Sequence, residues 1–512
     1  MNRMSLVGSS KSKFKVVGLA PIFAIIALLG WALASPVGSS PDDDFHLASI
    51  WCAAGDRANE CQTVADQSKR AVPEALGKSA CYAFKAEQSA ACQGTMFDDK
   101  KTGLVTTSRG NFQNIYPSLY YRTMNLFVSP NIEASVVLMR IINILLLVGL
   151  TTVLYFILPA RRRPTLVWGL AISLVPLGLF LVTSNNPSAW AIISAGTLWI
   201  SLVGYFESSG AQKVVLGLVA ALSTVLGAGA RADAAAYALV AIVAVVLLTA
   251  RLNRRWIISA LLPLAMAVTA AAFYFSTKQS LVATSGMPIG ADPSQAISPR
   301  YLFFKNLLNV PYLWTGVFGT RGLGWLDTFV PGIVWVGSFG CFTALAFAGL
   351  VSRSTRKLLA LAIALGALWF IPTYTLTLSR TVDVNQLQPR YILPLIILLG
   401  GVALLQVGEE SLKLSKEQIV ALVFTLSVAN AIALHVNMRR YITGAGVKSW
   451  NLNTAVEWWW NIPVSPMVVW VVGSVSFAAF LVIISMGPVV RSAAGDGAAR
   501  DGFAGDVSRS GS

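Results

Sequence analysis

The chain has 512 residues, of which 55% are hydrophobic and only 12% are charged, and its formal net charge is +16. Soluble domains carry about 25% charged residues, so this composition argues against a soluble globular protein. The basic residues form short clusters between hydrophobic runs, which excludes a soluble basic face and with it a nucleic-acid partner. We therefore expect a multi-pass protein with the lipid bilayer as its solvent.

Hydrophobic runs long enough to cross a bilayer recur along the chain and predict an all-α polytopic fold. We expect twelve membrane-spanning helices, at residues 15–34, 134–158, 165–183, 188–206, 213–230, 234–250, 256–275, 330–350, 358–378, 391–407, 417–436 and 466–487. The close pair at 213–250 also fits one kinked hydrophobic region. The first run favours an uncut anchor over a cleaved signal peptide, since its apolar core exceeds about 15 residues.

Basic clusters follow every second predicted span, which places these positions and both termini in the cytoplasm of a plasma-membrane protein. Residues 1–14 are then a cytoplasmic N-terminus, and residues 15–487 form the transmembrane domain. Two large extracytoplasmic loops follow, at 35–133 and 276–329, the second with an interfacial helix around "RYLFFKNLLNV". The Gly-, Ala- and Ser-rich tail at 488–512 is expected to be disordered and cytoplasmic.

Four of the five cysteines lie in the first large loop, and Cys341 lies in a predicted span. An even set in an oxidising compartment indicates two disulfides. A zinc site is disfavoured because the short paired spacings are absent. Neighbouring cysteines are the first expectation for the pairing, with Cys52 joined to Cys61 and Cys81 joined to Cys92.

Charged and amide side chains gather at the predicted outer membrane boundary. They are Asp42, Asp43, Asp44, His46, Arg140, Asn185, Asn186, Arg231, Asp233, Asp327, Arg380, Asp383 and Arg390. Ionisable groups near hydrocarbon are costly and usually pair or line a polar cavity, so this gathering predicts a functional site. For any single residue, an ordinary juxtamembrane position is the alternative.

The segment "PDDDFH" places three carboxylates and a histidine directly after the first span. Clustering raises the proton affinity of at least one carboxylate. Asp42 and Asp43 are therefore candidates for a general base, or for ligands of a divalent cation such as Mg²⁺ or Mn²⁺. Taken alone, the tripeptide also fits a solvated acidic turn.

Four motifs occur in order: "PDDDFH", "SNNPSAW", "GLGWLDTFVP" and "QPRYILP". Together they resemble the membrane family described as domain of unknown function 2142, over about residues 20–440. Asp42 and His46 match the first motif of that family, while Asp43 stands where Glu is usual. The later motifs correspond to Asn186, to Trp325 and Asp327, and to Arg390 and Tyr391. Pro389 departs from the Gly that often precedes Arg-Tyr in the family, which puts the backbone geometry there in doubt.

The layout is similar to that of the C-fold (GT-C) glycosyltransferases, which take a sugar from a polyprenyl-phosphate carrier on the outer face of the membrane. That resemblance implies Asp42 or Asp43 as the general base and an envelope glycan, lipid or protein as the acceptor. Arginines would stabilise the phosphate leaving group, and the candidates are Arg390, Arg231 and Arg140. The candidates for substrate binding are His46, Asp44, Asn186, Trp325, Asp327 and Tyr391.

Other interpretations stay open from the residues alone. His46 also fits a cap on the loop, and outer tryptophans also fit an interfacial belt. A transporter of lipid-linked sugars suits twelve spans, although the chain shows no paired halves. A non-catalytic protein of envelope assembly is the third possibility.

Overall fold

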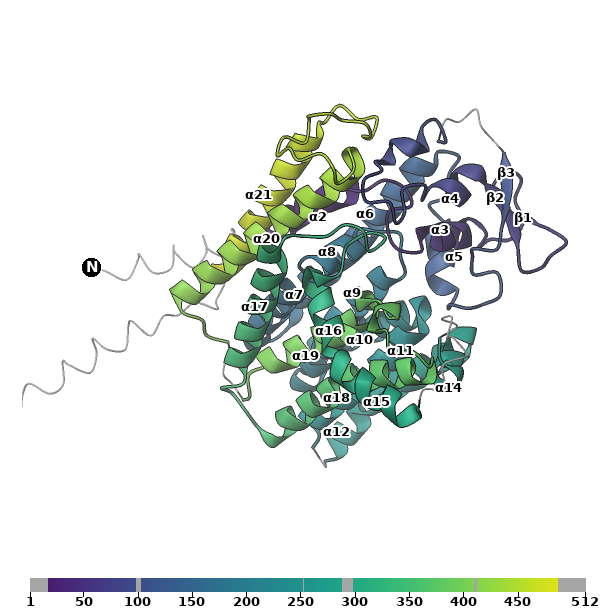
Figure 1. Ribbon diagram of the computed structural model, residues 1–512. Helices are drawn as coiled ribbons and strands as arrows, with labels where there is room; N and C mark the ends of the chain where they lie inside the picture. Colours follow the sequence, from purple (N-terminus) through teal and green to yellow (C-terminus); the bar gives the residue numbers. More distant parts are fainter. Residues whose placement is uncertain (1–16, 98–102, 252, 288–297, 409–411, 487–512) are drawn as a thin grey trace, which may run out of the picture.

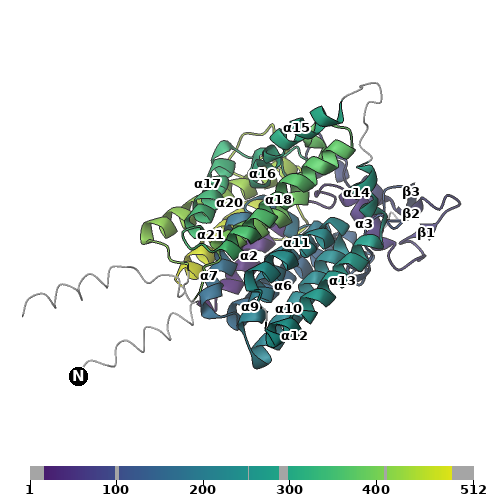
Figure 2. The ribbon, with the colours of Figure 1, turned by 90° about the horizontal axis from the view of Figure 1, so that it is seen from below.

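The computed structural model describes residues 17–97, 103–251, 253–287, 298–408 and 412–486. Figures 1 and 2 show a mainly helical molecule with a small sheet at one end. The predicted cytoplasmic N-terminus at 1–14 and the predicted disordered tail at 488–512 lie outside the described residues.

Helices of varied length, most of them apolar, make up most of the described chain. They are α2 (Ala20–Leu33), α6 (Ile132–Ile157), α7 (Arg163–Leu174), α8 (Leu177–Val182), α9 (Ser188–Glu207), α10 (Gly210–Ala230), α11 (Ala232–Thr249), α12 (Arg254–Ser259), α13 (Leu261–Phe275), α17 (Gly332–Gly349), α18 (Thr355–Leu378), α19 (Pro389–Leu404), α20 (Lys416–Ile442) and α21 (Pro466–Ser485).

Nine helical segments in the described part of the chain are long and apolar enough to cross a membrane, with α12 and α13 taken together as one segment. The other three predicted spans are also helical but shorter. Helix α2 has 14 residues and α19 has 16, and the run at 165–183 is divided into α7 and α8 at Val175 and Pro176. Nine of the twelve predicted spans are therefore candidate membrane spans by length and composition, and the other three stay predictions.

Helix α9 is the most enclosed of the long helices and packs against α10, α11 and α19. Glycines allow this close packing. A Cβ added at Gly227 of α10 would lie 2.4 Å from the Oγ of Ser194, and one at Gly401 of α19 would lie 2.3 Å from the Trp199 ring. Small residues of this kind let helix backbones approach each other in a membrane.

The segment between α2 and α6 folds into a compact unit beside the helix ends (Figure 1). It contains a three-stranded antiparallel sheet in the order β1-β2-β3, in which Ala71 faces Thr106. Its elements are α3 (Asp43–Trp51), β1 (Gln62–Thr63), β2 (Arg70–Pro73), α4 (Glu74–Lys78), η1 (Ala90–Gln93), β3 (Leu104–Thr107) and α5 (Leu119–Asn125).

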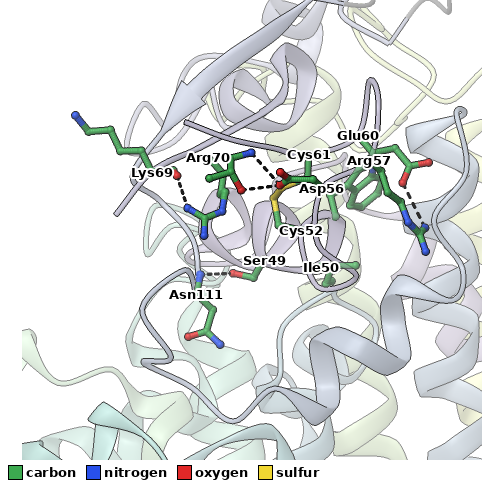
Figure 3. Close-up of a disulfide and its surroundings, with 12 residues drawn as sticks. Ser49, Ile50, Cys52, Asp56, Arg57, Glu60, Cys61, Lys69, Arg70 and Asn111 are labelled. Carbon is green, nitrogen blue, oxygen red and sulfur yellow. Dashed lines mark hydrogen bonds and ion pairs between the residues drawn. A yellow bond between two sulfur atoms is a disulfide. The ribbon is translucent and has the colours of Figure 1, made fainter. Parts of the chain in front are cut away.

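Two disulfides brace this unit, Cys52–Cys61 and Cys81–Cys92, as the sequence predicted. Figure 3 shows the first of them at the end of α3, where the Oγ of Ser49 accepts a hydrogen bond of 2.7 Å from the backbone N–H of Asn111. The disulfide thus lies close to the junction between α3 and the loop after β3. Cys341 is a buried free thiol in α17.

Two helix boundaries are informative. Helices α10 and α11 are separate, because Arg231 between them has an extended backbone (φ −151°, ψ 139°). Helix α20 continues six residues beyond its predicted end at 436, carrying Arg439 and Arg440 to backbone carbonyl acceptors. The predicted helix around "RYLFFKNLLNV" is present as α15 (Pro299–Asn309), which packs on α18 (Figure 2).

Candidate functional site

The turn between α2 and α3 is fixed by one buried arginine. Arg140 of α6 donates hydrogen bonds of 2.6 to 2.7 Å to the carbonyls of Ala32, Ser35 and Pro36, and one of 3.0 Å to Asn185 Oδ1. The last carbonyls of a helix lack donors within it, and Arg140 provides a donor to one of them, that of Ala32. Arg140 also binds two carbonyls of the turn that follows α2. Since Arg140 lines neither of the cavities described below, we leave it out of the phosphate site that we propose.

Three of the four sequence motifs meet at the backbone just before α3. Asn186 and Arg390 both donate to the carbonyl of Pro41, over 2.9 and 2.8 Å, and the indole of Trp325 donates to the carbonyl of Gly38 over 2.9 Å. Residues almost 350 positions apart thus hold the same few backbone atoms. The convergence that the sequence suggested is present.

Asp42 lies at the start of α3 in the left-handed conformation, with φ of 62°. Its side chain does not cap the helix but accepts from two arginines, from Arg390 over 2.5 Å and from Arg109 over 2.9 Å. The side chain stays 32% exposed. Although burial opposes its ionisation, Arg390 and Arg109 hold the pKa of Asp42 well below its ordinary value.

Asp43 is fully buried, and its Oδ2 accepts a hydrogen bond of 3.1 Å from the backbone N–H of Ser40. No hydrogen bond from a described residue reaches its Oδ1. Burial raises the pKa of Asp43 from 3.8 to about 7, because a charged carboxylate loses its hydration there. The pKa values of the adjacent carboxyl groups of Asp42 and Asp43 are therefore shifted in opposite directions.

His46 lies one turn further along α3, and its Nδ1 is 2.9 Å from the hydroxyl of Tyr121. Its Nε2 is buried, with no hydrogen-bond partner among the residues that the structure describes. Burial holds the pKa of His46 well below its ordinary value, so the ring is neutral at pH 7. A neutral ring with one unsatisfied nitrogen fits a binding role as well as a role in loop structure.

A cavity of about 1040 Å³ opens beside this turn, among α11, α13, α18 and α19. Arg231 and Tyr391 line it, and the Arg231 guanidinium lies 4.8 Å from the Tyr391 ring centroid and forms an ion pair of 2.6 Å with Asp233. Most of the remaining lining is apolar, with Lys278 as a second cation. Tyr391 also connects the cavity to Asp42, because Arg390 donates to the hydroxyl of Tyr391 and to Asp42.

A second cavity, of about 620 Å³, is lined mainly by residues of the unit between α2 and α6. Asp44 and Arg109 line it together with Trp325 and Phe84, whose rings meet edge to face at 5.3 Å. Arg109 binds both oxygens of Asp44 over 2.7 and 3.0 Å and also reaches Asp42. Asp42 is therefore linked through its two arginine partners to both cavities.

Asp327 is buried in an ion pair that holds the fold together. It is 8% exposed and forms an ion pair of 2.8 Å with Arg440, whose side chain also donates to the carbonyls of Tyr82, Lys85 and Gln88. This ion pair fastens the turn that carries Trp325 to α20 and to the loop unit. Its contribution to the site is to position Trp325.

The described residues contain no group of three or more His, Cys, Asp or Glu side chains that could hold a metal ion. The two predicted ligands also point to different partners, since Asp42 binds two guanidinium groups and Asp43 binds a backbone N–H. This donor set fits a divalent cation poorly, because the charge of Asp42 is already neutralised. The predicted cation stays an untested prediction, and no step below uses one.

Four residues that contribute to the site were missed in the sequence. Arg109 lies in the loop after β3, where nothing in the local pattern distinguishes it. Tyr116 faces Arg231, and Tyr121 contacts His46. Neither tyrosine lies in one of the sequence motifs, so there was no reason in the sequence to select them. Arg440 had a usable signal, since two arginines at a predicted outer helix end run against the positive-inside rule.

No curated protein and no solved structure matches the chain. A family description does match it, "Predicted membrane protein (DUF2142)", over residues 25–399. The matched region runs from α2 through most of α19 and includes every motif residue at the turn. The chain belongs to the DUF2142 family of predicted membrane proteins.

Proposed function

We propose that the protein transfers a sugar from a polyprenyl-phosphate carrier to an envelope glycan, lipid or protein acceptor on the extracytoplasmic face of the membrane. The observation that carries the proposal is the position of Asp42, a charged and partly exposed carboxylate. Its partner Arg109 lines one cavity, and its partner Arg390 contacts Tyr391, which lines another. A two-substrate transfer needs such a group between its donor and its acceptor.

The cavity of about 1040 Å³ fits the donor. Its walls are mainly apolar side chains of candidate membrane spans, which suit a polyprenyl chain, and its cations Arg231 and Lys278 suit a phosphate. Arg390 lies behind the lining residue Tyr391, and its buried Nε has no hydrogen-bond partner among the described residues. Guanidinium groups bind phosphate oxygens in pairs and stabilise the charge that develops on a leaving phosphate.

In this mechanism Asp42 accepts the proton of the attacking acceptor hydroxyl. The acceptor oxygen forms a bond to the anomeric carbon, the bond from that carbon to the phosphate oxygen breaks, and polyprenyl phosphate leaves with the electron pair. Arg231 and Arg390 stabilise the resulting negative charge.

Donor binding also prepares the base. In the free protein the pKa of Asp42 is far too low for an efficient general base, because Arg390 and Arg109 stabilise its charge. A donor phosphate competes for Arg390 and so weakens its stabilisation of Asp42. The pKa of Asp42 then rises when the donor is in place, which limits proton transfer to the loaded protein.

The cavity of about 620 Å³ fits the acceptor. Trp325 and Phe84 offer aromatic faces for a sugar ring, and Asp44, Lys78 and Arg109 offer polar contacts at its rim. The predicted substrate-binding roles of Asp44 and Trp325 belong to this cavity, while Tyr391 belongs to the donor cavity. Asn186 acts indirectly, by holding the Pro41 carbonyl beside Asp42.

The test is transfer from a set of radiolabelled polyprenyl-phosphate sugars to envelope acceptors, using membranes that contain wild type, Asp42→Asn or the exposed control Asp66→Asn. We expect wild type and the control to label an acceptor, and Asp42→Asn to lose labelling at equal expression. Labelled lipid that crosses the membrane without forming a product, equally in all three, would instead identify a transporter. No labelling and no lipid movement would favour the non-catalytic assembly protein.

A further inference from the structure

A third cavity lies at the opposite ends of the same helices. Helix α9 begins beside the Pro41 turn and ends at Glu207, and its 20 residues correspond to about 30 Å at 1.5 Å per residue. At that far end a cavity of about 470 Å³ is bordered by the ends of α9, α11 and α19 and the starts of α12 and α18. Figure 1 places α12 at the bottom of the molecule, far from α3.

This cavity is strongly basic. Its charged lining consists of one carboxylate, Glu207, and five cations, Arg161, Arg162, Arg251, Arg356 and Lys357. The formal excess is four positive charges in a space among membrane helices. Such an excess repels itself and is reduced by a bound anion.

Two of the cations are held as part of the frame. Arg162 binds both oxygens of Glu207 over 2.5 and 2.9 Å and donates to the carbonyl of Gln406 over 2.5 Å. Lys357 donates to the carbonyls of Gly349 and Ser352 over 2.7 and 2.8 Å. These contacts fix the walls of the cavity.

Arg161 also pairs with Glu207, over 3.3 Å, whereas two cations and one indole of the lining have no partner among the described residues. The exposed side chains of Arg251 and Arg356 form no hydrogen bond or ion pair with any residue that the structure describes. Trp256 also lines the cavity, stacked on Phe206 at 5.7 Å, and its buried indole N–H has no partner in the same set of residues. A buried donor without a partner is costly to the folded state.

We infer that this cavity binds a phosphate-bearing anion. Arginine forks match phosphate oxygens, and basic pockets between membrane helices on the cytoplasmic side characteristically take anionic headgroups. The volume lies within the range of about 300–1000 Å³ typical of small-molecule sites. The anion is either the headgroup of an anionic phospholipid in the adjacent leaflet or a soluble phosphate. The site is separate from the proposed transferase centre and does not depend on it.

The test uses the full chain and two double variants of equal charge. Arg251→Gln with Arg356→Gln removes the two unpaired cavity cations, and Arg254→Gln with Arg353→Gln removes two exposed arginines of the same region that do not line the cavity. In the lipid arm, nanodiscs of phosphatidylcholine with and without phosphatidylglycerol are analysed by native mass spectrometry for retained lipid. In the soluble arm, inorganic phosphate and pyrophosphate are titrated at constant ionic strength, with thermal unfolding as the readout.

We expect wild type and the control pair to bind equally, and the cavity pair to bind about tenfold more weakly, because two charge-assisted contacts are lost. A difference confined to the lipid arm identifies a headgroup, and one confined to the soluble arm identifies a free phosphate. The inference is overturned if the two double variants bind equally in both arms, or if wild type binds neither probe. The unfolding temperature without ligand verifies that both variants are folded.

Discussion

At the scale of single residues, neighbouring carboxylates differ in what they can do. Asp42 is charged, partly exposed and linked to both large cavities through Arg390 and Arg109. Asp43 is buried, and burial raises its pKa to about 7. The sequence did not distinguish them, because the difference comes from arginines supplied by distant segments. The geometry favours Asp42 as the base and Asp43 as a support of the turn.

Asp43 makes a testable contribution to the pH dependence of stability. Its pKa is raised from 3.8 to about 7 in the folded protein, so the folded state binds a proton that the unfolded state has lost between these values. The stabilisation is fully present below pH 3.8 and is lost as pH rises through about 7. We expect Asp43→Asn to remove this loss, since an uncharged amide can still accept from the Ser40 N–H.

The measurement is the unfolding temperature of wild type and Asp43→Asn between pH 5 and pH 8. Wild type should lose several degrees more than Asp43→Asn over this interval, in which the carboxyl of Asp43 loses its proton. Parallel curves for the two proteins would show that Asp43 titrates normally, and the exposed variant Asp66→Asn provides the matched control.

At the scale of elements, the site depends on the length of helix α20, whose last turn reaches the segment that carries Trp325. Helix α20 runs to Ile442, and Arg440 near its end joins Asp327 to three carbonyls of the loop unit. Hydropathy ended this helix at 436, because it assigns charged residues to a loop. Burial of Arg440 is possible because four acceptors from two segments, three carbonyls of residues 82–88 and the Asp327 carboxylate, surround it.

Because of this network, we expect substitutions of Arg440 and Asp327 to lower the free energy of unfolding by different amounts. Arg440→Met leaves a buried Asp327 carboxylate and several carbonyls without a donor, and we expect a loss of about 3–5 kcal/mol in the free energy of unfolding. Asp327→Asn keeps an oxygen acceptor for Arg440 and should cost less. Denaturant unfolding of both variants measures the order, and a larger loss for Asp327→Asn would contradict it.

The same scale shows what could be predicted. The apolar spans follow from length and hydropathy, and the disulfide pairing follows from neighbouring cysteines, since Cys52 pairs with Cys61 and Cys81 pairs with Cys92. The short strands of the loop unit gave no comparable signal. The contact between Arg109 and Asp42 depends on how that unit packs on α3, which no local pattern encodes.

At the scale of the whole molecule, polar groups concentrate at two ends of an apolar bundle. One end holds the Asp42 turn with its two cavities, and the other holds the basic cavity near Glu207. The topology predicted from hydropathy and basic clusters was sufficient to predict that distant polar residues gather at the first end. The second end was seen in the sequence only as basic clusters that set the predicted orientation, because a cavity cannot be read from charge alone.

The most direct test of the central claim separates donor binding from transfer in Asp42→Asn. Donor binding is measured with a labelled polyprenyl-phosphate sugar, and transfer is measured in a single turnover with an acceptor that wild type labels. We predict near-normal donor binding and a transfer rate lower by about 10²–10⁴-fold, the usual contribution of a general base. Transfer at the wild-type rate, or loss of transfer in Asp43→Asn with Asp42→Asn active, would contradict the assignment of Asp42 as the base.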